Sequence, residues 1–293
     1  MVAAAALVSL AAGSSAGEPR VLARITTGTA PCGAVAALGS LWIANDGGSL
    51  VRIDPKRNRV TRRIPVGHGS CSLAAGAGAF WIANYKRGLL RVLASGRVRR
   101  VDVGAVPFDV VVAYDRVWVT AWEDGLLTVV NPRTLRVERR IAVGERPMGL
   151  IARNAAIWVG FGRSATSIAR VNPRSFDVQR IDIGARAPGW PVAGARDLWF
   201  QSEEGQLIHV DADRRRVVGR VRFGRTLGQG ARAPDGTLWV PDKEQSLVYR
   251  VDPARRSVLG SFPAGSGAYL ALRAFGSMWV TSYAGSDVWR YKP

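Results

Sequence analysis

Tryptophan recurs along the chain at nearly constant intervals, and this spacing constrains the fold more than any other feature. The repeating residues are Trp42, Trp81, Trp118, Trp158, Trp199, Trp239 and Trp279. Successive members lie 37 to 41 residues apart. A repeat of about 40 residues is typical of a four-stranded β-propeller blade. The sequence therefore predicts seven copies of one β-unit.

Each copy carries signals for four short strands, as in "SLWIANDGGSLVRIDPKRNRV" (Ser40 to Val60). A Val/Ala/Leu run ends in a turn before the tryptophan, and the tryptophan opens the second run. The third run alternates apolar and polar residues and stops at a pair such as Asp54-Pro55. The fourth run ends at a recurring glycine such as Gly67. We name these four strands A to D in chain order.

The two ends of the repeat array predict how the ring closes. The segment "VLARITTG" (Val21 to Gly28) resembles a strand D but precedes the first tryptophan, whereas the last copy ends after its strand C, "SDVWRYKP". The N-terminal strand should complete the last blade, because closure removes unpaired sheet edges. We predict one all-β domain over residues 17–293, a seven-bladed propeller of four-stranded antiparallel blades closed by the N-terminal strand.

The first 16 residues have the pattern of a signal peptide. An uninterrupted small-apolar run is followed by "SSA", which predicts cleavage after Ala16. No Lys or Arg precedes the run, so a start codon assigned too late or a disordered Ala-rich tail are the alternatives. A signal peptide predicts an extracytoplasmic protein that is secreted, periplasmic or at the cell surface.

The combination "LWIAN…LVRIDP…RVTRRIPVG" resembles the seven-bladed YVTN and virginiamycin B lyase-like propellers of bacteria, over residues 21–293. The resemblance implies the propeller fold, and export is common in that group. Its lyase members use histidines and acidic metal ligands in the central funnel, which implies a lyase-like enzyme as an alternative function. This chain has two histidines, His68 and His209. His209 takes a strand C position that other copies fill with arginine, so we expect it to face solvent.

Residues around the predicted channel mouth are the candidates for ligand binding. Strands A and B are antiparallel, so the start of A and the end of B meet at the same mouth. The residues at these positions differ between copies while the tryptophans do not. The candidates are Asn45, Asp46, Asn84, Tyr85, Phe108, Trp122, Glu123, Phe161, Trp190, Glu203, Gln229, Asp242, Tyr269 and Tyr283.

This ring of aromatic and acidic residues predicts a module that binds a small ligand or a protein partner by stacking and hydrogen bonding. Ordinary polar loop tips, with aromatic rings packed against neighbouring blades, are the alternative. No cluster has metal-ligand spacing and no catalytic motif is present, so the sequence predicts no metal, no cofactor and no catalytic residue. We expect a monomer.

The two cysteines, Cys32 and Cys71, stand one repeat apart at equivalent positions near the mouth. In an exported protein such a pair suggests a disulfide. Two unpaired core residues, or a redox or metal pair, are the alternatives.

The chain is strongly basic, with 41 Lys+Arg against 22 Asp+Glu, a formal net charge of +19 and a pI near 11.3. The arginines concentrate in C–D turns and D strands, which the propeller places on the outer rim. Charged outer strands protect sheet edges from aggregation. The alternative is a basic rim that holds the protein against anionic envelope polymers or lipid headgroups. Nucleic acid is not expected as a partner, because the basic residues are spread around the ring without a recognition motif.

Overall fold

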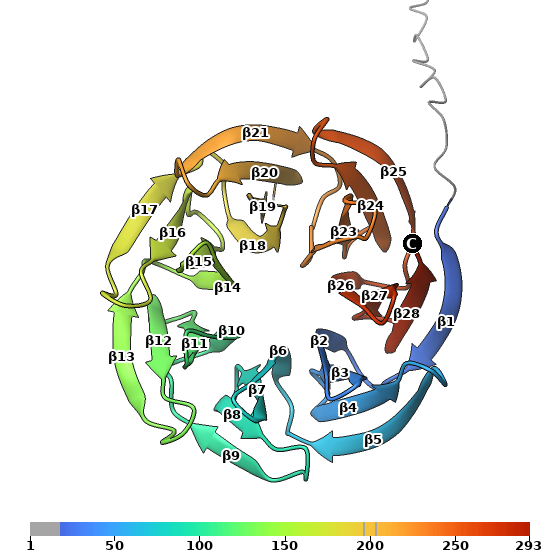
Figure 1. Ribbon diagram of the computed structural model, residues 1–293, viewed down its shortest axis with the longest axis horizontal. Coiled ribbons are helices and arrows are strands. Elements are labelled where there is room, and N and C mark those ends of the chain that lie inside the picture. The colour runs from blue at the N-terminus through green and yellow to red at the C-terminus, as the bar shows by residue number, and fades with distance from the viewer. Residues whose placement is uncertain (1–17, 196, 203) are drawn as a thin grey trace, which may run out of the picture.

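The computed structural model describes residues 18–195, 197–202 and 204–293. The predicted signal peptide, residues 1–16, and the candidate Glu203 lie outside the described residues. The described chain is all-β and forms seven four-stranded antiparallel sheets arranged as blades of a ring (Figure 1). The predicted fold class is confirmed.

The first four blades each use four consecutive strands. Blade 1 contains β2 (Pro31–Ala37), β3 (Ser40–Asn45), β4 (Ser49–Asp54) and β5 (Arg59–Pro65). Blade 2 contains β6 (Ser70–Gly76), β7 (Ala79–Asn84), β8 (Gly88–Val92) and β9 (Val98–Val101). Blade 3 contains β10 (Pro107–Ala113), β11 (Arg116–Ala121), β12 (Leu126–Val130) and β13 (Val137–Ala142). Blade 4 contains β14 (Pro147–Arg153), β15 (Ala156–Phe161), β16 (Ser167–Val171) and β17 (Val178–Asp182).

The last three blades follow the same order, with two departures. Blade 5 contains β18 (Pro188–Ala193), β19 (Leu198–Ser202), β20 (Gln206–Asp211) and β21 (Arg216–Arg222). Blade 6 contains β22 (Ala231–Arg232), β23 (Leu238–Asp242), β24 (Leu247–Asp252) and β25 (Ser257–Pro263), so its inner strand has only two residues. Blade 7 contains β26 (Ala268–Ala274), β27 (Ser277–Ser282), β28 (Asp287–Lys292) and the N-terminal β1 (Arg20–Thr26).

The ring closes between the two ends of the chain, as predicted. Strand β1 pairs antiparallel with β28, and the two lie side by side at the right of Figure 1. The Arg24 guanidinium lies 3.8 Å from the centre of the Trp289 ring. Thr27 donates a hydrogen bond to Asn45 of blade 1, so the closing segment also contacts the next blade.

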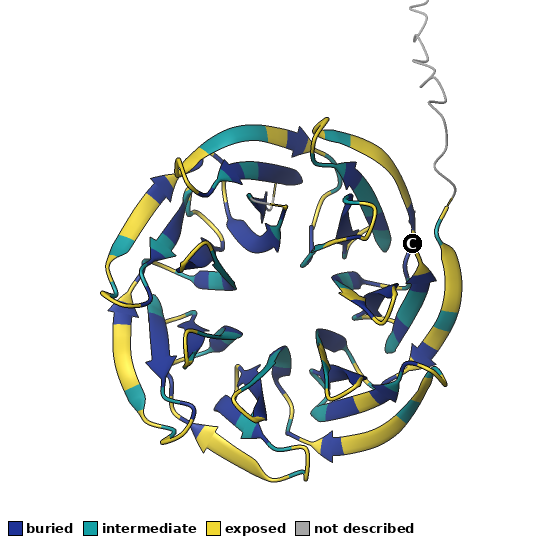
Figure 2. Cartoon of the chain, in the orientation of Figure 1, coloured by how far each residue is buried: buried dark blue, intermediate teal, exposed yellow. Residues whose placement is uncertain are grey.

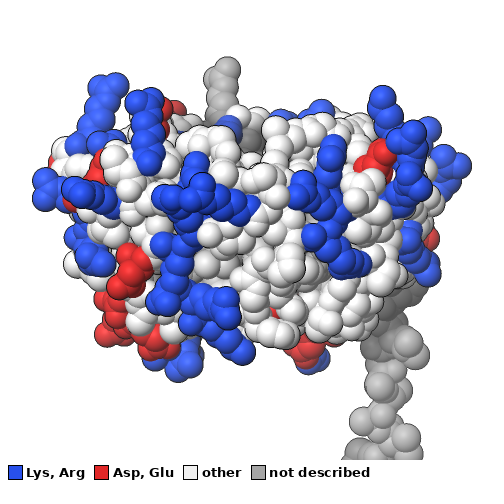
Figure 3. Space-filling model, turned by 90° about the horizontal axis from the view of Figure 1, so that it is seen from below, with Lys and Arg blue, Asp and Glu red and all other residues white. Residues whose placement is uncertain are grey.

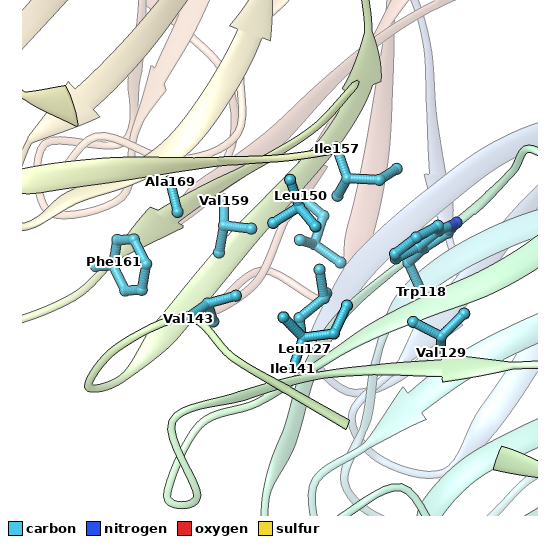
Figure 4. Packing of buried hydrophobic residues seen from close by; sticks show 11 residues of the cluster. Trp118, Leu127, Val129, Ile141, Val143, Leu150, Ile157, Val159, Phe161 and Ala169 are labelled. Atoms are coloured by element: carbon cyan, nitrogen blue, oxygen red, sulfur yellow. The ribbon is translucent and has the colours of Figure 1, made fainter. Parts of the chain in front are cut away.

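The repeating tryptophans form the core between neighbouring blades. All seven are 2% exposed or less. Trp118 of blade 3 packs in one cluster with Ile157 and Val159 of blade 4 (Figure 4). Five indoles also donate a hydrogen bond to the carbonyl five residues earlier, namely those of Trp42, Trp81, Trp118, Trp158 and Trp279. That bond ties strand B to the end of strand A, so the tryptophan is a scaffold residue in each copy.

The outer D strands are the most exposed part of each blade (Figure 2). Several of their arginines nevertheless join one blade to the previous one. The Arg63, Arg180 and Arg220 guanidinium groups donate hydrogen bonds to the carbonyls of Thr27, Val143 and Ile183, respectively. Part of the arginine excess on the outer wall (Figure 3) therefore has a structural use.

No helix with the length and hydrophobicity of a membrane span occurs in the described residues.

Candidate functional site

The inner strands, β2, β6, β10, β14, β18, β22 and β26, surround a central channel (Figure 1). A cavity of about 610 Å³ occupies it and is lined by inner-strand residues such as Asp109, Val112 and Arg273. A second cavity of about 250 Å³ lies at the mouth, lined by Asp46, Tyr85, Phe108, Lys243, Tyr269 and Tyr283, among others. Cys71 and Tyr269 line both cavities, so they lie at the boundary between mouth and channel.

Five aromatic side chains form a continuous path across this boundary. Trp122 stacks on Phe108 with ring centres 5.0 Å apart, and Phe108 lies 5.8 Å from Trp190. Trp190 meets the edge of Tyr269 at 6.1 Å, and Tyr269 lies 5.7 Å from Tyr283. The rings come from blades 3, 5 and 7, which are not neighbours in the ring. The path therefore crosses the channel, instead of packing within one blade interface.

The path ends at a carboxylate held by two tyrosines. Asp46 accepts hydrogen bonds from the hydroxyls of Tyr85 and Tyr283, both at 2.8 Å, and from the backbone N–H of Gly69 at 3.1 Å. Burial, and then the hydrogen bond to Asp46, raise the pKa of both tyrosines. The two hydroxyls therefore stay protonated at neutral pH and act as donors.

Lys243 supplies a positive charge at the same place. Its Nζ lies 4.2 Å from the centre of the Tyr283 ring and 5.6 Å from that of Tyr269. No carboxylate among the described residues lies within ion-pair distance of this ammonium. Lys243 lines both the mouth cavity and a third cavity of about 490 Å³ between blades 5 and 6.

The sequence reasoning missed Lys243, although the repeat contains the signal for it. The residue four positions after each repeating tryptophan reaches the mouth in four other blades. The seven residues at this offset are Asp46, Tyr85, Trp122, Gly162, Glu203, Lys243 and Tyr283. Lys243 is thus the direct equivalent of Asp46, and reading the copies at one fixed offset would have selected it.

The residue three positions after the tryptophan has the opposite environment. Neighbouring strand residues face opposite sides, so a shift of one position moves a side chain from the mouth into the blade. The candidates Asn45, Asn84, Phe161 and Asp242 all have this offset, and each is 0% exposed.

These buried candidates hold the scaffold. Asn45 donates to the Thr27 carbonyl and to Ser49, and Asn84 donates to the carbonyls of Gly67 and His68. In the same way, Asp242 accepts the backbone N–H groups of Arg225 and Gln245. Phe161 packs in the core between blades 3 and 4 (Figure 4).

The other candidates divide between the mouth and its surroundings. Phe108, Trp190 and Tyr269 belong to the aromatic path. Gln229 lines the 610 Å³ channel cavity. Glu123 points outward beside Trp122, with its side chain 53% exposed and 4.0 Å from Arg146. Trp122 forms the outer end of the path.

Asp109 is a buried carboxyl in the channel wall that sequence reasoning also missed. It is 4% exposed and accepts hydrogen bonds from the Ser72 hydroxyl and from the backbone N–H groups of Val110 and Leu150. These partners come from blades 2, 3 and 4. Burial raises the pKa of Asp109 to about 6, against the lowering effect of its hydrogen bonds.

Cys32 and Cys71 form a disulfide that joins the inner strands of blades 1 and 2. Their Cα atoms are 5.2 Å apart. A Cβ at Gly33 would lie 2.1 Å from the Cys71 carbonyl oxygen, which shows that the two inner strands approach closely here. Both cysteines line the channel cavity.

The two histidines have different surroundings. His68 is exposed. His209 stacks on Trp199 with ring centres 4.1 Å apart, its Nε2 lies 2.9 Å from Asp197, and its side chain is 11% exposed. The expectation that His209 faces solvent was wrong, because its ring covers the repeat tryptophan. Within the described residues, no group of three or more His, Cys, Asp or Glu side chains has an arrangement that could hold a metal ion.

The sequence matches no protein-family model, and no curated protein is detectably similar to it. Solved structures do resemble it. Virginiamycin B lyase from Staphylococcus aureus has a TM-score of 0.79 at 13% identity, with 94% of this chain and 99% of that chain covered. A catalytically inactive variant of that enzyme with quinupristin has a TM-score of 0.78 at 14% identity, with 94% and 98% covered.

The structure of U3-55K is similar as well, with a TM-score of 0.76 at 11% identity, covering 95% of this chain and 99% of that chain. At these identities the likeness shows a common fold. The chain is therefore a seven-bladed β-propeller that resembles virginiamycin B lyase at the level of the fold.

Proposed function

We propose that this protein is an exported binding module that takes a small planar ligand with an anionic group at the channel mouth. The aromatic path that crosses the channel carries this proposal, together with the Lys243 ammonium at its end, which has no carboxylate partner within the part of the chain that the structure describes. Aromatic rings bury large area and stack on planar groups, and an ammonium without a carboxylate partner attracts an anion. Export is supported by the pattern of the first 16 residues and by the disulfide.

The titratable groups of the mouth favour binding over acid–base chemistry. The Tyr85 and Tyr283 hydroxyls and the Gly69 N–H hold Asp46 in place, and the raised pKa values of the two tyrosines make their hydroxyls weak acids that stay protonated near neutral pH. They are suited to orienting a ligand. A virginiamycin B lyase-like enzyme is the alternative, and Asp109 is the observation in its favour, because a pKa of about 6 allows proton exchange near neutral pH.

A second candidate function is adhesion to an anionic envelope surface through the C–D turns. The side chains of Arg57, Arg214 and Arg255 are 68%, 73% and 80% exposed in these turns. Each also pairs with an aspartate at the start of its own turn, which lowers the net charge presented.

Ligand binding at the mouth is tested by a thermal-shift screen of planar anionic metabolites, with metal ions included as separate wells. Tyr269→Ala and Lys243→Met should abolish the shift given by any hit, whereas Lys56→Met removes an exposed lysine on the opposite face and should leave it unchanged. Hits that persist in both mouth variants contradict the proposed site. Hits that are lost in Lys56→Met as well contradict it too, because they indicate a general charge effect.

A further inference from the structure

A cleft lies between blades 5 and 6, beside an inner segment of blade 6 that pairs with two blades. In six blades the inner strand has six or seven residues, whereas β22 has two. Before β22, Leu227 and Gly228 pair with β23 of blade 6, whereas Gln229 makes backbone hydrogen bonds to Tyr269 and Ala271 of blade 7. A Cβ at Gly228 would lie 2.0 Å from the Tyr269 carbonyl oxygen, so only glycine permits this approach. The cavity on the blade 5 side of this segment has about 490 Å³, a volume typical of small-molecule sites, which span about 300–1,000 Å³.

Gln201 on β19 lines this cleft with an unsatisfied amide. The residue is 2% exposed, and neither its Nε2 nor its Oε1 has a hydrogen-bond partner. Among the described residues, Gln201 alone has both polar atoms of one side chain buried and unpaired. Buried polar groups without partners are costly and rare, so the pair of atoms needs an explanation.

The equivalent residues of the other blades show whether the fold needs a long polar side chain at this position. Gln201 lies two residues after its repeat tryptophan, and the six equivalents are all smaller. They are Ala44, Ala83, Thr120, Gly160, Pro241 and Thr281. The two polar equivalents are satisfied by backbone, since Thr120 accepts from the Asp109 N–H and Thr281 accepts from the Leu270 N–H. The scaffold therefore does not require a long amide here.

The other residues that line the cleft form the surroundings of the Gln201 amide. Met148, Leu227 and the Trp190 ring give an apolar wall, and Lys243 stands at the side shared with the mouth. A side-chain amide offers one acceptor and a two-hydrogen donor in one plane, which is the complement of another amide.

We propose that the cleft between blades 5 and 6 binds a primary carboxamide attached to an apolar or aromatic group. Gln201 Oε1 accepts a hydrogen bond from the ligand N–H, and Gln201 Nε2 donates one to the ligand carbonyl. The cleft shares Lys243 and Tyr269 with the mouth cavity, but the Gln201 amide has no part in the proposed function, so this proposal goes beyond that function and does not depend on it.

The test compares benzamide with acetophenone, which has the same carbonyl and ring but no N–H, by ligand-observed NMR titration of the full chain. Benzamide should bind about tenfold more tightly, because acetophenone leaves Oε1 unpaired. Gln201→Leu should weaken benzamide more than acetophenone and leave the two with about equal affinity, because it removes two hydrogen bonds from benzamide and only the bond from Nε2 to the carbonyl from acetophenone. Tyr85→Phe, which alters the mouth but not the cleft, should leave both affinities unchanged.

Thermal unfolding of Gln201→Leu is the second measurement. Replacing an unpaired buried amide by an apolar group of similar size should keep or raise Tm. A lower Tm means that the amide has a partner within the protein and overturns the proposal. Equal binding of benzamide and acetophenone to the wild-type chain, or no binding of benzamide to it, overturns the proposal as well. A loss of benzamide affinity in Tyr85→Phe equal to that in Gln201→Leu also overturns it. If Gln201→Leu does not fold, Gln201→Glu replaces the donor by an acceptor and should shift preference from benzamide to benzamidine; an unchanged preference refutes the assignment.

Discussion

The stability of this propeller should contain a contribution from Asp109 that decreases as pH rises. Asp109 is 4% exposed, and burial raises its pKa from the usual 3.8 to about 6. The folded state therefore retains a proton that the unfolded chain releases between those two pH values. By linkage, the contribution is fully present below pH 3.8 and is lost as pH rises through about 6. A pKa change of this size corresponds to about 3 kcal/mol of unfolding free energy.

Asp109→Asn isolates this contribution, because an asparagine keeps the shape and does not titrate. Its carbonyl oxygen can accept the Leu150 N–H, and its amide can donate to the Ser72 hydroxyl. We expect the unfolding free energy of the variant, relative to wild type, to increase by about 2 kcal/mol between pH 4 and pH 7, because part of the contribution is already lost at pH 4. Urea denaturation at several pH values in this range measures the difference. The variant can be less stable than wild type at pH 4 without contradicting the prediction. The prediction concerns how the difference in unfolding free energy between the two proteins changes with pH.

Asp54→Asn provides a control of opposite sign. The hydrogen bond from Arg57 holds the pKa of Asp54 below its usual value, so Asp54 stabilises the fold above that range and loses this effect in acid. The Asn variant should therefore lose stability relative to wild type as pH rises through the acidic range. A constant difference between wild type and Asp109→Asn from pH 4 to pH 7 would refute the burial argument, as would a difference that follows the Asp54 control.

Three further predictions follow from the ring itself. The disulfide closes a loop of 39 residues, so its reduction should lower the unfolding free energy by about 4 kcal/mol. Thiol titration in denaturant should find no thiol before reduction and two after it. Two thiols before reduction would contradict the bond. Arg180→Met removes a hydrogen bond to the Val143 carbonyl and a guanidinium 4.5 Å from the Phe161 ring centre. It should lower the unfolding free energy measured by urea denaturation by about 1–2 kcal/mol. Arg214→Met, in an exposed turn, should change this free energy by less than about 0.5 kcal/mol. If the C–D turns adhere to anionic surfaces, the protein should sediment with phosphatidylglycerol vesicles at low salt and be released at high salt; no sedimentation at low salt would remove this function.

The scaffold was predictable from sequence because its residues repeat. Seven buried tryptophans at a spacing near 40 residues specify the blade count, and a strand D signal before the first copy specifies the closure. The departure in blade 6 was not predictable in the same way. Its inner segment is interrupted at Gln229, which pairs with blade 7, and this pairing accompanies the close approach of Gly228 to Tyr269 across a blade boundary.

The mouth was predicted in part, and the errors have one physical origin. The candidate positions mixed two offsets from the tryptophan, which face opposite sides of the strand end. Asp46 reaches the mouth, whereas Asn45 is buried and holds the Thr27 carbonyl. Lys243 was passed over beside Asp242 for the same reason. Asp109 could not be selected by a repeat argument, because its role comes from Ser72 and Leu150 on two other blades.

The repetition separates scaffold from specificity in a way that a non-repeating fold does not allow. Residues at the tryptophan position and three positions later are buried in all seven blades, so they are constrained by packing. Residues two and four positions after the tryptophan vary, and the two least explained by packing, Gln201 and Lys243, line the same cleft between blades 5 and 6. Beside that cleft, the inner segment of blade 6 is interrupted at Gln229, which pairs with blade 7. An unpaired buried amide costs stability, and a ligand that pairs with Gln201 in this cleft would offset that cost.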